Sequence, residues 1–118
     1  MKAKQKKRIR KRTIEIRRAI SAMDHVSSGT LQTRTKVCGR PNCRCATDPD
    51  YRHGPYYEWN RRIDGRLVHR IISEQQAELV AQAIANYREI LRLLSLWERE
   101  TAEEILDGEG PRKARNQT

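Results

Sequence analysis

Three cysteines and one histidine lie within sixteen residues of this chain, and they include all of its cysteines. With the spacing C-x4-C-x-C-x7-H, the four residues are Cys38, Cys43, Cys45 and His53. The Gly-Arg-Pro-Asn sequence at residues 39–42 can turn the chain and return Cys38 to the other two cysteines. Thiolate and imidazole are the ligands that zinc prefers, and four of them complete the tetrahedron of a structural site. The spacing therefore predicts a loop closed by a structural zinc ion.

The same residues leave two alternatives to a zinc site open. Reduced thiols also pack as small apolar groups in cytosolic proteins, and two neighbouring thiols can form a redox pair. The identity of the fourth ligand is open as well, because other side chains could replace His53. These candidates are His25, Asp48, Asp50 and His69.

The composition allows only a small hydrophobic core. The chain has 118 residues, 36% of them hydrophobic and 34% charged, and it contains no phenylalanine. A metal ion would stabilise so small a domain. The sequence has neither an apolar run of membrane-spanning length nor the apolar stretch of a secretory signal, and an odd number of cysteines does not suit a disulfide framework. We therefore expect a cytoplasmic protein with no membrane segment.

Charge is distributed unevenly over a chain whose formal net charge is +10. Residues 1–18 contain ten Lys or Arg residues and one acid, Glu15, whereas residues 73–107 contain three basic and eight acidic residues. A basic segment of this density is typical of phosphate binding, because each neutralised phosphate releases counterions. Alternatively, the basic segment is a solvated, disordered tail, or it docks on the acidic C-terminal helix.

Residue periodicity predicts a helix and then a strand in the N-terminal part. From about residue 4 to residue 23, apolar residues recur at helical spacing, which predicts a helix with a narrow apolar stripe and a cationic remainder. The stripe consists of Ile9, Ile16, Ala19, Ile20 and Met23. After a break at residues 27–29, residues 30–37 alternate in polarity and predict a strand with one basic face, formed by Gln32, Arg34 and Lys36.

A hairpin and a long helix follow the cysteine loop. Asp64-Gly65 separates strand-like segments at 56–63 and 66–72, and this dipeptide strongly favours a two-residue hairpin turn. With the earlier strand, the hairpin predicts a three-stranded antiparallel sheet. Ser73 and Gln76 match a capping box, so a helix should begin at Glu74 and extend to a stop at Gly108. This helix is longer than a small sheet can cover. We therefore expect its second half to pack on the N-terminal helix or, preferably, on the same helix of a second copy of the chain.

These elements predict an α+β protein with a basic N-terminal helix, a zinc knot on a three-stranded sheet, a long C-terminal helix and a disordered tail. The corresponding segments are residues 1–29, 30–72, 73–107 and 108–118. Basic side chains, together with one exposed aromatic, form the candidate nucleic-acid interface. They are Lys4, Lys6, Lys7, Arg8, Arg10, Lys11, Arg12, Arg17, Arg18, Arg34, Lys36, Arg40, Arg44, Trp59, Arg61, Arg62, Arg66 and Arg70.

The cysteine region resembles a family of small uncharacterised prokaryotic proteins classified as a domain of unknown function. The resemblance rests on the block Cys-Gly-Arg-Pro-Asn-Cys-Arg-Cys from Cys38 to Cys45, which is followed by His53-Gly-Pro-Tyr, a hairpin and a helix. The resemblance covers residues 31–96. Members of that family are similar in the Cys-Gly-x-Pro-x-Cys-x-Cys and His-Gly-Pro-Tyr motifs and often accompany mobile genetic elements. The resemblance therefore implies a role with nucleic acid, but it implies no enzymatic activity.

We expect a nucleic-acid-binding accessory or regulatory protein of a mobile element, associated with the nucleoid, with double-stranded DNA as the favoured ligand and structured RNA as the second choice. The alternative is a protein-interaction adaptor whose long helix binds a larger recombinase or nuclease. An enzyme is not expected, because the sequence has no phosphate-binding glycine loop and no paired-carboxylate motif, and Glu58, the best acid near the cysteines, lies in a predicted strand.

Overall fold

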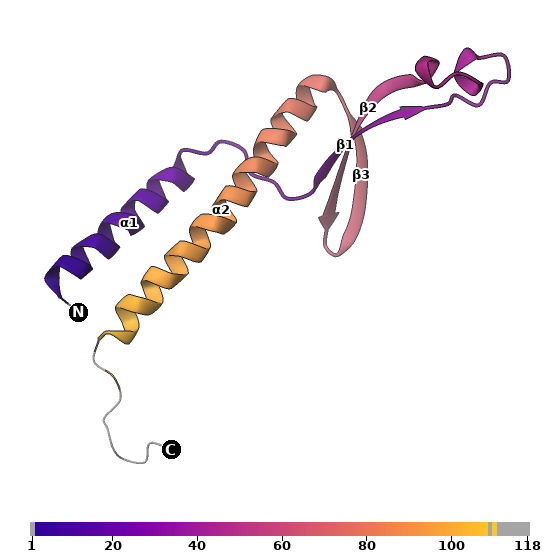
Figure 1. Cartoon of the computed structure of the whole chain (residues 1–118). Helices are drawn as coiled ribbons and strands as arrows, with labels where there is room; N and C mark the ends of the chain where they lie inside the picture. The colour runs from indigo at the N-terminus through magenta and orange to yellow at the C-terminus, as the bar shows by residue number, and fades with distance from the viewer. Residues whose placement is uncertain (1, 109, 111–118) are drawn as a thin grey trace. The chain divides into compact units, whose positions relative to one another are not determined.

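The computed structural model of the chain describes residues 2–108 and residue 110. Its elements, in chain order, are α1 (Ala3–Ser21), β1 (Thr30–Lys36), η1 (Arg44–Ala46), η2 (Pro49–Tyr51), β2 (His53–Ile63), β3 (Arg66–Ile72) and α2 (Glu74–Leu106) (Figure 1). They confirm the predicted α+β class, with a three-stranded antiparallel sheet and a long C-terminal helix. Within the described residues, no helix combines the length and the apolar character needed to cross a membrane. Of the predicted disordered tail, only Gly108 and Gly110 lie among the described residues.

Two compact units make up the chain, and α2 contributes to both. One unit, His25–Tyr87, contains the sheet, the cysteine loop and the first part of α2. The other unit combines the residues up to Asp24, which include α1, with the residues from Arg88 onward, which include the second part of α2. The segment boundaries expected from the sequence followed the ends of the elements, whereas the packing divides the chain within α2.

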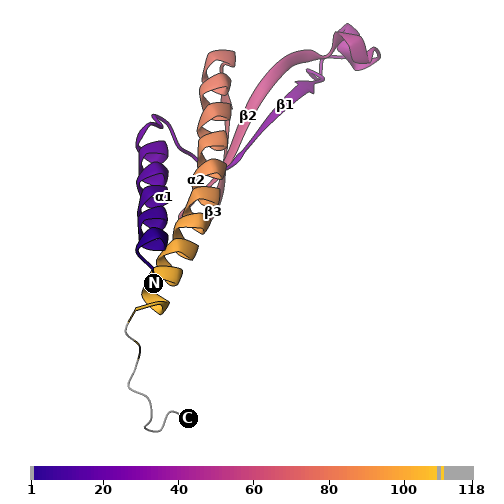
Figure 2. The ribbon, with the colours of Figure 1, turned by 60° about the vertical axis from the view of Figure 1, so that its left-hand side comes forward.

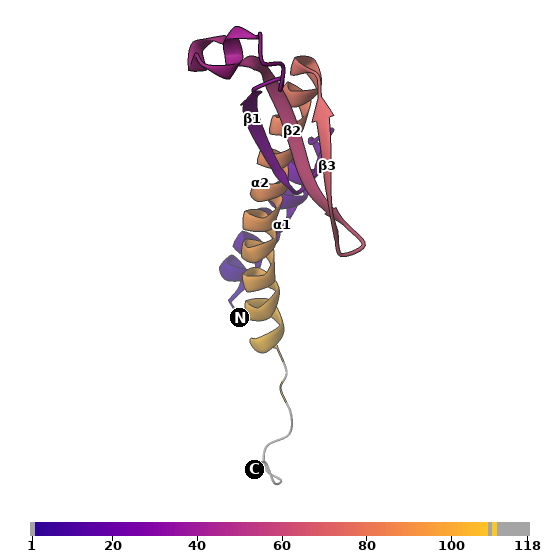
Figure 3. The same cartoon turned by 90° about the vertical axis from the view of Figure 1, so that its right-hand side faces the viewer.

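The sheet has the strand order β1-β2-β3, and both pairs are antiparallel (Figure 3). The turn between β2 and β3 consists of Asp64 and Gly65, with φ angles of 50° and 80°. Because both residue types tolerate a positive φ, the turn matches the twist of the two strands and fixes their register. This is the hairpin that the sequence predicts.

The second strand begins at His53, three residues before the predicted start at residue 56. The His-Gly-Pro sequence favours a break, but it forms the start of β2, because His53 pairs with Lys36 of β1 after a register shift. Gly54 makes this close pairing possible, because its φ is +127° and a Cβ there would lie 2.9 Å from the carbonyl oxygen of Arg34. The first strand ends at Lys36, one residue earlier than predicted.

One face of the sheet packs against the first part of α2. Trp59, Arg61 and Ile72 of this face line a groove together with Leu79 and Val80 of the helix. The residues of α2 that are buried in this unit are Ala77, Val80, Ala83 and Ile84. Since side chains alternate along a strand, the neighbouring positions project from the opposite face of the sheet, away from α2.

The predicted capping box starts α2. The amide of Gln76 donates to the Ser73 hydroxyl oxygen at 3.1 Å, and the Gln76 side-chain oxygen accepts from the amide of Ser73 at 2.9 Å. Further along the helix, the side chain of Asn86 donates to the carbonyl oxygen of His25 at 2.8 Å. The amide of Ser27 also donates to the carbonyl oxygen of Ala83 at 3.1 Å. These bonds attach the segment before β1 to the first part of α2.

In the other unit, α1 packs along the second part of α2 (Figure 2). Ile9 and Ile16 of α1 and Leu93 of α2 are buried. Arg12 donates to the carboxylate of Glu100 at 2.6 Å, and Glu100 has only 7% of its side chain exposed. The structure therefore places α1, one of the two partners that the sequence allows, against the second part of α2.

Candidate metal centre and nucleic-acid interface

The four predicted metal ligands lie in and beside the metal loop, residues 37–52, which connects β1 to β2. Cys38 follows the end of β1 by two residues, and His53 is the first residue of β2. Between them, Gly39 has a φ of +83°, and the amide of Cys43 donates to the carbonyl oxygen of Arg40 at 3.1 Å. Cys45 lies in the one-turn helix η1. The pairing of Lys36 with His53 therefore brings the two ends of the metal loop together.

The ligand atoms of Cys38, Cys43, Cys45 and His53 all lie within 4.8 Å of one another. The Sγ atoms of Cys38 and Cys45 are 3.5 Å apart, and the Sγ atom of Cys43 is 3.3 Å from Nε2 of His53. In a tetrahedral zinc site the donor atoms are about 3.6–3.8 Å apart, as follows from metal–ligand bonds of about 2.0–2.3 Å. A disulfide would require about 2.05 Å between sulfurs, and all three cysteines are free. The predicted Cys/His cluster is confirmed, and its four ligand atoms lie close enough together to bind a metal ion.

The alternative fourth ligands lie outside this cluster. Asp48 caps η2, where its side chain accepts from the amide of Asp50 at 3.0 Å. His69 lies in β3 and bonds with Asn60 of β2. Among the described residues, His53 is therefore the side chain that completes the cluster with the cysteines.

The environments of two thiols in the cluster differ. The backbone amide of Cys45 donates to Cys43 and lowers its pKa, and the neighbouring thiols act in the same direction. The amide of Cys38 favours the thiolate of Cys45, but burial and the neighbouring thiols together outweigh this effect and raise the pKa of Cys45. Cys45 is also the most enclosed ligand, with 2% of its surface exposed. The loop thus places one sulfur at the bottom of the site and the other ligands nearer to solvent.

Two of the nine predicted interface cations on α1 interact with α2 instead. Arg12 binds Glu100, which raises the pKa of Arg12, and the guanidinium of Arg17 lies 5.3 Å from the centre of the Trp97 ring. In the part of the chain that the structure describes, the other seven are exposed and form no ion pair. They are Lys4, Lys6, Lys7, Arg8, Arg10, Lys11 and Arg18. Lys4, Lys7 and Lys11 lie on the side of α1 opposite Ile9 and Ile16, as the helical repeat requires.

The predicted interface residues of the sheet lie on different surfaces. Trp59, Arg61 and Arg70 line the groove against α2, and the guanidinium of Arg61 lies 4.4 Å from the centre of the Trp59 ring. The side-chain nitrogens Nε1 of Trp59 and Nε of Arg61 are buried without a hydrogen-bond partner in the described structure. Arg34 and Arg62 project from the opposite face, as their positions in the register show.

The remaining members of the predicted interface lie at the edge of the sheet or in the metal loop. Arg66 is exposed at the start of β3, beside the hairpin turn. Lys36 lies at the end of β1, with its ammonium 5.3 Å from the centre of the Tyr56 ring. Arg40 is exposed in the metal loop, and the guanidinium of Arg44 lies 4.0 Å from the centre of the Tyr51 ring. The nine predicted residues of the sheet and the metal loop therefore do not form one continuous surface.

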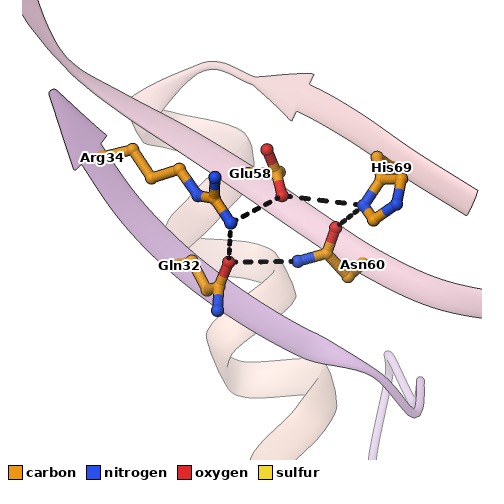
Figure 4. A network of polar contacts seen from close by, with 5 residues as sticks. All are labelled: Gln32, Arg34, Glu58, Asn60 and His69. Carbon is orange, nitrogen blue, oxygen red and sulfur yellow. Dashed lines mark hydrogen bonds and ion pairs between the residues drawn. The ribbon is translucent and has the colours of Figure 1, made fainter. Parts of the chain in front are cut away.

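The face of the sheet that is turned away from α2, which we call the open face, carries a polar network that the sequence analysis did not identify (Figure 4). Its members are Gln32, Arg34, Glu58, Asn60 and His69. Gln32 lies opposite Glu58, and Asn60 lies opposite His69, so residues far apart in the sequence meet. Alternation along a strand places Gln32 and Arg34 on one face of β1, and Glu58 and Asn60 on one face of β2. The pairing register, which joins the three strands, was needed to find the network.

A family model described as a domain of unknown function (DUF6788) matches residues 6–82. The chain belongs to this family. No curated protein and no solved structure matches it. The resemblance expected from the sequence covers residues 31–96. The DUF6788 match begins earlier than that, and it ends within α2.

The DUF6788 match contains the metal loop, the whole sheet and most of α1, including six of the seven exposed cations of that helix. Trp97 and Glu100, which hold α1 through Arg17 and Arg12, lie beyond the match. The candidate metal centre and the open face are thus features of the matched region, and the family description assigns no activity to either.

Proposed function

We propose that this protein is a nucleic-acid-binding protein stabilised by a structural zinc ion, with double-stranded DNA as its favoured ligand. The observation that carries the proposal is the exposed charge of α1, where seven cations have no carboxylate partner in the described structure. Contacts between such cations and the phosphates of a nucleic acid provide affinity without sequence recognition. The proposal contains no catalytic step. Structured RNA is the second ligand to test, because a cationic helix binds any phosphate backbone.

The packing of α1 supports this role. Ile9 and Ile16 are buried against α2, and Arg12 is paired with Glu100, so the helix is attached along one side. Cations at positions i, i+3 and i+4 on the other side are neighbours on the helix surface, about 5–6 Å apart. A preorganised row of charges loses less conformational entropy on binding than a disordered tail does.

The metal ion has a structural role in this proposal. Cys38, Cys43, Cys45 and His53 would hold a zinc ion, which would contribute folding free energy to the loop between β1 and β2. Three thiolates more than neutralise the charge of Zn²⁺, so the centre itself adds no positive charge to the interface. Four protein ligands also leave no open coordination position for catalysis.

The proposal is tested by measuring the affinity of the full chain for a labelled DNA duplex over a series of salt concentrations. We expect a steep decrease in affinity with salt. Replacing Lys4, Lys7 and Lys11 by Gln should reduce the slope of log K against log salt by about 2–3, because each lost phosphate contact lowers it by about 0.9. Circular dichroism should show unchanged helix content. Absence of salt-dependent binding by the unchanged chain would refute the proposal.

A second candidate function is favoured by an apolar groove on the second part of α2. It is lined by Leu94, Trp97, Glu98, Thr101, Ala102 and Ile105. Leu94 has 40% of its surface exposed and Ile105 has 68%. Such a surface suits a protein partner, either a second copy of the chain or the larger recombinase or nuclease of a mobile element. In that adaptor function, a complex with the partner would survive high salt, whereas DNA binding would not.

A further inference from the structure

The polar network of the open face is built across all three strands. Gln32 and Arg34 lie in β1, Glu58 and Asn60 in β2, and His69 in β3 (Figure 4). All five side chains belong to the face that is turned away from α2. They are therefore supported by the sheet from below and accessible from the other side, in an arrangement that does not depend on the position of α1.

Interactions within the network fix the orientation of Arg34 and Gln32. The side-chain oxygen of Gln32 accepts from Nη2 of Arg34 at 2.8 Å and from the amide of Asn60 at 3.4 Å. Glu58 lies at the centre, where its carboxylate is 3.6 Å from both Arg34 and His69. Only 15% of the Glu58 side chain is exposed, compared with 54% for Arg34 and 57% for His69. Glu58 thus acts as an inner support beneath more exposed groups.

Several donors of the network have no partner within the described structure. Gln32 uses its oxygen, which leaves the two hydrogens of its Nε2 group free. Arg34 uses one hydrogen of Nη2 in its hydrogen bond, which leaves the other Nη2 hydrogen, Nη1 and Nε without a hydrogen-bond partner. Gln32 and Arg34 are two residues apart on one face, so their Cα atoms are about 7 Å apart along the strand, and their side chains meet through the hydrogen bond between them. The open face therefore presents a short, fixed array of hydrogen-bond donors.

We propose that the open face enters the major groove of duplex DNA, where Arg34 and Gln32 donate to acceptors on base edges, with guanine preferred. This inference rests on the proposed function and specifies the surface that reads sequence. The O6 and N7 atoms of guanine are both acceptors in the major groove, and a two-donor contact from arginine to them is the commonest specific contact. Three strands span about 10 Å, which suits a groove about 12 Å wide.

The central carboxylate argues for base contacts at this surface. Glu58 places a negative charge beneath the array, which disfavours close approach of a phosphate but leaves the uncharged edge of a base acceptable. The exposed cations of α1 provide phosphate contacts elsewhere in the chain. Trp59, the aromatic residue expected to stack on bases, lies on the α2-facing side of the sheet, so the open face does not gain its stacking energy for single strands.

To test this, sequences that bind the full chain at fixed salt are selected from a library of random DNA duplexes. The specificity ratio is then the affinity for the selected duplex divided by the affinity for a scrambled duplex. We expect guanine-containing sites. Arg34→Ala should lower this specificity ratio by about 5- to 150-fold, the range for one lost two-donor contact, and change the salt slope by less than about one. Gln32→Ala should lower the ratio as well. Lys11→Gln, the matched control on α1, should reduce the salt slope and leave the ratio unchanged.

A further variant tests the support role of Glu58. Glu58→Gln keeps the shape but removes the charge that orients Arg34, so the selected sites should become less uniform while the melting temperature stays close to that of the unchanged chain. Duplex binding without sequence preference, or an unchanged ratio in Arg34→Ala, would overturn this inference and leave the proposed function standing. Tighter binding to duplex RNA would also overturn it, because the major groove of A-form RNA is too narrow for side chains to read. Absence of any binding would refute both proposals.

Discussion

At the scale of single residues, Cys45 is the side chain on which the metal loop depends most. Its sulfur is enclosed, it accepts from the amide of Cys38 at 3.4 Å, and it lies 3.5 Å from the sulfur of Cys38. A ligand that is already enclosed in this way loses little further freedom when it binds a metal. The four side chains of the cluster come from the metal loop and from the start of β2, so a metal ion bound by them would connect both ends of the loop.

We predict that Cys45→Ser abolishes binding of one zinc ion per chain and lowers the melting temperature, because the free energy of metal binding is part of the folding free energy. Elemental analysis and thermal unfolding with and without a chelator measure both effects. The matched control is Asp50→Asn, which changes a nearby acid outside the cluster and should retain zinc. Equal melting temperatures of the unchanged chain with and without chelator would contradict a structural metal.

At the scale of elements, the start of α2 is determined by two reciprocal hydrogen bonds between Ser73 and Gln76. Ser73→Ala removes the acceptor for the Gln76 amide, so we predict a loss of about 1 kcal/mol in the free energy of unfolding, the typical value for a lost cap. Urea denaturation measures it. Ser95→Ala, an exposed position inside the same helix, should be neutral or slightly stabilising, because alanine has the higher helix propensity. Equal effects of the two substitutions would argue against the cap.

The elements that could be predicted from the sequence are those determined by local chemistry. Asp64-Gly65 and Ser73 to Gln76 determine their own structures through a positive φ and a cap, and the cysteine spacing predicts the metal cluster. The start of β2 depends on pairing with β1, which the His53-Gly-Pro sequence does not indicate. The open-face network could not be predicted either, because it requires the register that places Gln32 opposite Glu58. Likewise, the apolar stripe of α2 indicates that this face of the helix is buried, but it does not identify the element that buries it.

At the scale of the whole molecule, the apolar groove of α2 and the charge of the chain make opposing contributions to self-association. Burial of residues such as Leu94 and Ile105 favours a dimer, whereas a net charge of +10 on each copy opposes it, increasingly so at low salt. We predict a homodimer through α2 that sedimentation equilibrium detects at moderate salt and that persists at high salt. Ile105→Lys should weaken it, and Glu104→Lys, an exposed position outside the groove, should not do so to the same extent. A monomer at all salt concentrations would rule out this interface.

The metal loop also has a consequence for the lifetime of the protein. It contains Arg44 and Arg52, residues after which trypsin-like proteases cut, and a bound metal ion would hold both of its ends. A protease must draw a segment of several residues into an extended conformation before it can cleave. The closed loop resists this, but a metal-free loop would not. Cleavage there would break the covalent connection between β1 and β2 permanently, so the supply of metal would determine how long each newly made chain survives as well as whether it folds.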